Sequence, residues 1–154
     1  YYQNLNALLC EAVDTINKEL SDHLDGLWER KGPVDSLSSL NDRVLDFATL
    51  MVEHFAKNVH VYYPFISTEI DFSYFKQRDG HPYAHPAYAL LHAEMAAHKT
   101  LLKLDEDGIR VLTDVLAYIF HAKMHFFLRY QVPETLETLE AELAAELALV
   151  LARA

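Results

Sequence analysis

Apolar residues recur at intervals of three and four positions through most of this chain, which is the period of an amphipathic α-helix. The stretches that carry this pattern cover about residues 2–30, 35–67, 86–103, 106–131 and 134–153. Only 4 Gly and 5 Pro occur among 154 residues, and so few turn formers favour long helices over many short strands. The sequence therefore predicts an all-α fold.

Short breaks join most of the predicted helices, which favours antiparallel neighbours. Residues 68–86 contain Asp-Gly and two His-Pro pairs and predict the one long connection. No repeat or change of composition divides the chain, so we expect a single domain over residues 1–154. It would be an up-down-up-down four-helix bundle of about residues 2–131 with an additional C-terminal helix at about 134–153. That helix carries a leucine stripe, which would pack on the bundle or form a homodimer through residues 134–153.

The composition excludes several functional classes. A formal charge of −10 argues against a nucleic-acid or anionic-membrane partner. The one cysteine, Cys10, excludes an internal disulfide and gives no sign of an oxidising compartment, so a cytoplasmic location is expected. No targeting pattern opens the chain, and no apolar run approaches the roughly 18 residues of a membrane span. Because no nucleophile or phosphate-loop motif is present, an enzyme is less expected than a binding protein.

Polar side chains interrupt the apolar faces of four predicted helices. His121 and His125 stand one helical turn apart in the apolar stretch 116–131, and they project from the same side of a helix. Buried imidazoles and carboxylates need partners, and a metal ion would supply one to all of them. The candidate ligands are His23, His54, Glu94, His98, His121 and His125, with Asn58 one turn after His54.

Nitrogen-rich ligation without thiolates makes iron the best candidate, and a pair of irons fits this number of ligands better than one. A single iron, manganese and zinc stay open. Each histidine also has a structural interpretation, because a core imidazole commonly bonds a backbone carbonyl. The remaining histidines fall off the apolar faces or in the long connection and are expected to be solvated or capping; they are His60, His81, His85 and His92.

The spacing of these residues resembles that of the hemerythrin-like (HHE cation-binding) domains. The segment from His54 to Pro64 is similar to the second-helix pattern of that family, in which a His is followed four residues later by Glu and ten residues later by Pro. His23 stands 31 residues before His54, near where such domains place their first-helix histidine. The segments around His98 and His121 resemble the third-helix and fourth-helix segments.

The resemblance implies a four-helix bundle that holds a non-haem di-iron site and binds or senses oxygen or nitric oxide, or handles iron. Two positions depart from the family pattern. Asn58 stands at the position of a bridging Glu, and His125 stands at the position of an acidic ligand. Glu94 would then have to supply the carboxylate that balances the charge of the ions. A shifted di-iron site, a single-ion site and a bundle without metal all stay open.

The leading expectation is a non-haem iron protein that binds a small diatomic ligand. A second interpretation is a helical interaction or regulatory module with structural histidines. A third is non-covalent haem binding by two inward histidines, since no Cys-x-x-Cys-His attachment motif is present.

Overall fold

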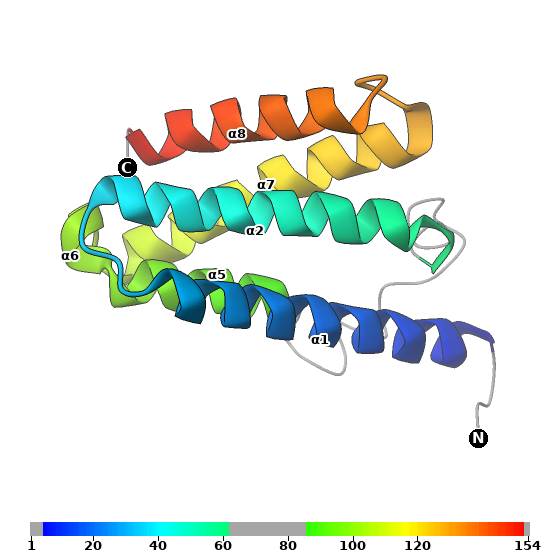
Figure 1. Ribbon diagram of the computed structural model, residues 1–154, viewed down its shortest axis with the longest axis horizontal. Helices are drawn as coiled ribbons and strands as arrows, with labels where there is room; N and C mark the ends of the chain where they lie inside the picture. The colour runs from blue at the N-terminus through cyan, green and yellow to red at the C-terminus, as the bar shows by residue number, and fades with distance from the viewer. Residues whose placement is uncertain (1–4, 62–85, 153–154) are drawn as a thin grey trace.

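The computed structural model describes residues 5–61 and 86–152, and no strand occurs among them. The all-α prediction is confirmed (Figure 1). The helices are α1 (Leu5–Lys31), α2 (Leu37–Lys57), α5 (Pro86–Ala97), α6 (Lys99–Leu102), α7 (Glu106–Tyr130) and α8 (Leu136–Ala152).

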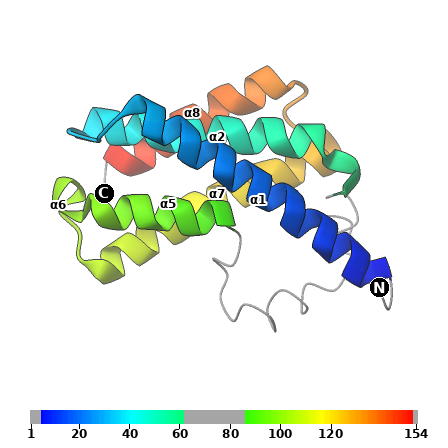
Figure 2. The same cartoon turned by 60° about the horizontal axis from the view of Figure 1, so that its bottom comes forward.

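The long helices run back and forth and pack side by side (Figure 1). Helix α1 packs against α2 and α5, α5 packs against α7, and α8 packs against both α2 and α7. Figure 2 shows that α1 crosses its neighbours at an oblique angle. The leucine stripe of the last helix faces this packed interior, because Leu139, Leu143 and Leu147 are buried. The homodimer through residues 134–153 stays a prediction.

Local signals in the sequence set several helix ends. Helix α1 ends where Lys31, Gly32 and Pro33 predict, and Gly32 adopts a positive φ of 80° that favours glycine. Ser36 caps α2 by accepting a hydrogen bond from the backbone N–H of Ser39. The Asp105 side chain accepts a bond of 2.8 Å from the N–H of Gly108 and begins α7. These local features account for the end of α1 and for the starts of α2 and α7.

Two predicted helices are interrupted rather than continuous. Helix α2 ends at Lys57, Asn58 leaves the helical conformation with φ −112° and ψ 25°, and residues 59–61 are helical again. The predicted third helix is interrupted at His98, which separates α5 from α6 and has φ −115° and ψ 25°. In both places a side chain bonds the carbonyl four residues earlier, and such local bonds compete with regular helix. Pro64 and most of the long connection lie outside the described residues.

The inward face of α1 overlaps the face that its apolar pattern predicts but is rotated from it. The spacing of Leu9, Val13, Ile16, Leu20 and Leu27 predicts an inward stripe that includes His23, yet His23 is exposed. Its buried face is made by Cys10, Val13, Asn17, Leu20, Leu24 and Trp28. The large Trp28 side chain is 2% exposed, so the rotation that buries this indole turns His23 outward.

Aromatic rings fill the centre between α2, α5 and α7. Phe47 lies 5.6 Å from Tyr88 and 5.9 Å from Phe120 between ring centroids, and Phe55 lies 5.8 Å from Phe120. All four side chains are buried. Such tilted pairs contribute about 0.5–1.5 kcal/mol each beyond the burial of their surface. The interior of the described fold is therefore a packed aromatic cluster of Phe47, Phe55, Tyr88 and Phe120.

One described helix, α7, is long and apolar enough to cross a membrane by length and composition, with a mean hydropathy of 1.2 over its most apolar window. This corrects the expectation that no stretch approaches a span. The finding is weak evidence for a membrane, because a core helix of a globular protein passes the same test. One face of α7 is indeed buried against the other helices, at Ile109, Leu112, Leu116, Phe120 and Met124.

Candidate functional site

Glu94 lies beside an arginine that the apolar pattern did not single out. Arg43 Nη1 of α2 approaches Glu94 Oε1 of α5 to 3.2 Å, and the two side chains are only 12% and 15% exposed. Oε1 is buried and lacks a partner with hydrogen-bond geometry among the described residues, so this contact is an ion pair rather than a directed bond. The carboxylate that would balance a metal charge is thus already neutralised by a guanidinium.

Arg43 is held in place by further contacts. Its guanidinium carbon lies 5.6 Å from the centroid of the Trp28 ring, a distance typical of a cation–π contact. Its Nη2 also donates to the carbonyl oxygen of Gly32 and lies 3.4 Å from that of Trp28. Arg43 therefore ties the end of α1 and α5 to α2.

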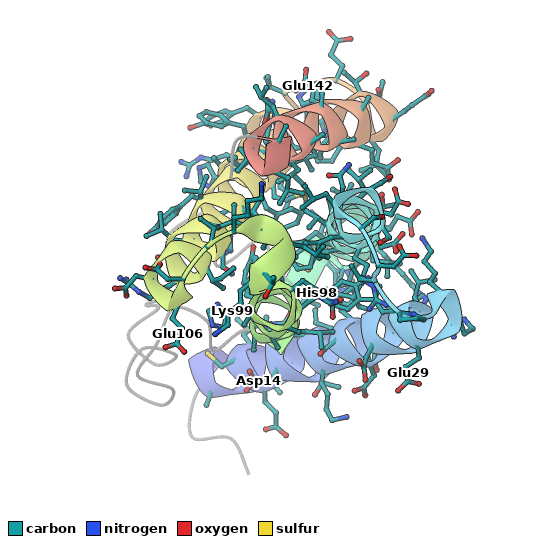
Figure 3. All side chains as sticks on the ribbon, turned by 90° about the vertical axis from the view of Figure 1, so that its left-hand side faces the viewer. Asp14, Glu29, His98, Lys99, Glu106 and Glu142 are labelled. Carbon is teal, nitrogen blue, oxygen red and sulfur yellow. The ribbon has the colours of Figure 1, made fainter. Side chains whose placement is uncertain are left out.

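His98 lies at the end of α5, where the chain turns into α6 (Figure 3). Its Nδ1 donates to the backbone carbonyl of Glu94 at 2.9 Å and lies 3.5 Å from Glu94 Oε1. The half-buried ring therefore completes a cluster with Arg43 and Glu94, which we call the Arg43–Glu94–His98 cluster. With Nδ1 bonded to the carbonyl, only Nε2 of His98 is left for any other ligand.

His121 lies against the aromatic cluster. Its ring centroid is 5.0 Å from that of Tyr88 and 6.3 Å from that of Phe120. The residue is exposed, yet desolvation by the surrounding helices lowers the pKa of its imidazole. Packing against the neighbouring helices therefore disfavours the charged form of the ring.

His125 has different neighbours from His121, although the two are one turn apart. Its ring lies 6.0 Å from Phe126 and 6.4 Å from Tyr130, between centroids. These are residues of the same end of α7. The structure thus places His121 and His125 in separate ring clusters.

His54 is half-buried on α2. Desolvation is the largest effect on it and lowers the pKa of its imidazole; the positive charge of Lys57 lowers this pKa further, while the negative charge of Glu19 on α1 opposes both. The side chain of Asn58 is engaged locally, because its Nδ2 donates to the backbone carbonyl of His54 at 2.9 Å.

The lowered pKa predicts how stability depends on pH. Above the unfolded-state value of about 6.5, His54 is neutral in both states and costs nothing. As the pH falls below this value, the unfolded chain takes up the proton first, so the free energy of unfolding should decrease until the folded pKa is reached. His54→Gln should flatten this part of the curve. Urea midpoints between about pH 7.5 and 5.5 would test this, and an unchanged slope in the variant would contradict it.

Within residues 5–61 and 86–152, no group of three or more His, Cys, Asp or Glu side chains is arranged to hold a metal ion. His81 and His85 lie outside these residues. The proposed ligation by His23, His54, Glu94, His98, His121 and His125 stays a prediction.

Two polar residues that contact a neighbouring helix, Arg43 and His92, were not predicted to do so from the sequence. Arg43 stands one turn before Phe47 on the inward side of α2, and that position could have marked it as a partner for a buried carboxylate. His92 was expected to be solvated or capping, but it is half-buried and its Nδ1 lies 3.3 Å from the Thr113 hydroxyl of α7. Both residues link separate helices, and local spacing does not indicate which residue of another helix a side chain will contact.

Comparison with known proteins adds no relative: no protein family profile, curated protein or solved structure matches this chain. The resemblance to hemerythrin-like domains therefore remains an interpretation of its residues.

Proposed function

We propose that this chain is a non-catalytic helical module that acts by association, and that its interior histidines and Glu94 are structural. In this proposal α1, α2, α5 and α7 form an up-down-up-down four-helix bundle to which α8 is added. The observation that carries the structural role of Glu94 is the ion pair of 3.2 Å between Arg43 and Glu94.

The ion pair matters because Glu94 is the only carboxylate among the candidate ligands. A cation bound to Glu94 would stand close to the Arg43 guanidinium as well. Two unit positive charges 4 Å apart repel each other by about 4 kcal/mol at an effective dielectric constant of 20, and a divalent ion would double this. The remaining candidates are neutral imidazoles or an amide, so none of them would offset that charge. A structural role for Glu94 costs no such repulsion.

A second candidate function is the non-haem iron protein of the sequence analysis, cytoplasmic and binding a diatomic ligand. The lowered pKa values of His54 and His121 favour it, because a neutral imidazole is the form that ligates metal. In that case the ion pair between Arg43 and Glu94 would have to break before Glu94 could bind iron.

Metal analysis of the full chain separates the two candidates. We expect protein purified aerobically to contain well under one iron per chain, to lack visible absorption bands, and to keep its thermal midpoint when a chelator is added. A structural metal would make that midpoint fall with chelator, since bound metal stabilises only the folded state. Stoichiometric iron with a chelator-sensitive midpoint would overturn the associating-module proposal in favour of the iron protein.

A further inference from the structure

We propose that a second copy of this chain docks on the outer face of α7 in an antiparallel arrangement; this rests on the proposed associating role. The α7 outer face consists of Val111, Val115, Tyr118, Phe126 and Tyr130, with Val132 directly after the helix. All six are among the exposed large apolar residues, and Tyr118 is 71% exposed. The other side of α7 carries its buried core residues, so this helix is apolar on two opposite sides.

The spacing of these residues makes a continuous strip rather than scattered exposure. Steps of four and three residues lead from Val111 through Val115 to Tyr118, and the helical period of 3.6 keeps them on one side of the helix. Ala122, which is also exposed, continues the strip towards Phe126. The rings of Phe126 and Tyr130 pack at 5.9 Å and close its C-terminal end.

The area of the strip is large for a monomer and modest for a permanent dimer. An aromatic side chain carries about 150–250 Å² of surface, so Tyr118, Phe126 and Tyr130 at their exposures of 71%, 53% and 57% present on the order of 350 Å². With the valines, the patch reaches the upper range for soluble monomers. It falls short of the roughly 800 Å² per partner of a standard interface, so we expect a weak, reversible dimer.

Charge along α7 selects an antiparallel second copy. The first turn holds Glu106 and Asp107, which are exposed, whereas the last turn holds the exposed Arg129. A parallel copy would set acid against acid. An antiparallel copy centred near Tyr118 sets Asp107 of each chain opposite Arg129 of the other. In this arrangement the two helix dipoles are antiparallel, which is also favourable. Asp107 already has a weak partner in Arg110 at 3.5 Å, and exposed pairs of this kind exchange at little cost.

Sedimentation velocity of the full chain tests the proposal. Over about 1–300 µM protein, the average mass should rise from 17.7 kDa towards twice that value. Tyr118→Glu should weaken association at least about tenfold, with an unchanged helical circular-dichroism spectrum because the side chain is exposed. The matched control is Leu149→Glu on α8, where the leucine is 56% exposed and the dimer should persist.

A charge exchange tests the orientation. Asp107→Arg alone and Arg129→Glu alone should each weaken the dimer, and the double variant should restore it, because every antiparallel pair then regains opposite charges. Failure of the double variant to recover would overturn the antiparallel arrangement.

Other occupants of the α7 outer face give different results. A chain that stays monomeric at about 300 µM overturns docking of a second copy, as does a dimer that Leu149→Glu dissociates and Tyr118→Glu does not. Binding of the monomer to neutral phosphatidylcholine vesicles through Tyr118 would overturn it in favour of a lipid surface. None of these outcomes depends on metal content, so failure of second-copy docking is distinguishable from failure of the proposal that the interior histidines and Glu94 are structural, which the chelator experiment decides.

Discussion

Replacing Phe120 with alanine should lower the free energy of unfolding by about 4 kcal/mol, within the range for large-to-small substitutions of a buried aromatic residue. Phe120 is 0% exposed and meets three rings, those of Phe47, Phe55 and Tyr88. Alanine would leave a cavity among them that cannot collapse fully, since the rings belong to two different helices, α2 and α5. For a domain of this size we expect the thermal midpoint to fall by roughly 10 °C. Urea unfolding followed by circular dichroism measures the loss.

The matched control for this substitution lies on the same helix. Phe126→Ala removes the same atoms from a side chain that is 53% exposed. At protein concentrations where the chain is monomeric, it should change the stability by less than about 0.5 kcal/mol. Equal losses in the two variants would contradict a centre packed around Phe120.

Replacing Arg43 with methionine should lower the free energy of unfolding by about 3 kcal/mol. The loss arises because Glu94 would keep its charge at a position where the side chain is only 15% exposed, without the guanidinium that faces it at 3.2 Å. The packing of Arg43 over the Trp28 ring would also be replaced. Equilibrium urea unfolding at pH 7.5 reports this loss directly.

The double variant Arg43→Met with Glu94→Leu separates the charge effect from the packing effect. It should regain most of the lost stability, because removing both members of a buried ion pair leaves no uncompensated charge. Lys18→Ala offers the matched control: Lys18 pairs with Asp22 at 2.8 Å, but both side chains are largely exposed, so no measurable change is expected. A stable Arg43→Met variant would show that Glu94 does not depend on this arginine.

Helix positions could be predicted well, and helix interruptions could not. The 3.6-residue period indicated α7 and α8 nearly to the residue, because it records which side of each helix avoids water. The breaks at Asn58 and His98 escaped, since each lies inside a run of apolar spacing. Each break depends on one side chain that hydrogen-bonds a backbone carbonyl instead of water, and the 3.6-residue period does not encode that bond.

In the candidate site, too, contacts within one helix could be predicted and contacts between helices could not. Helical spacing correctly indicated that Glu94 and His98 are neighbours one turn apart. It said nothing about Arg43, which lies far away in the sequence and meets Glu94 only because α2 and α5 pack at one particular height and rotation. The predicted inward position of His23 is wrong for a related reason, because the rotation of α1 that buries Trp28 leaves His23 exposed.

Local physics in the sequence therefore specified the class of fold, most helix ends and the existence of polar groups on apolar faces. These follow from backbone periodicity, capping and the removal of apolar surface from water, which act over a few residues. Packing between helices specified the partners: a guanidinium for Glu94, aromatic rings around His121, and an uncovered apolar face on α7. Each of these depends on the relative rotation and axial shift of two helices, and the shapes of many side chains set that geometry together.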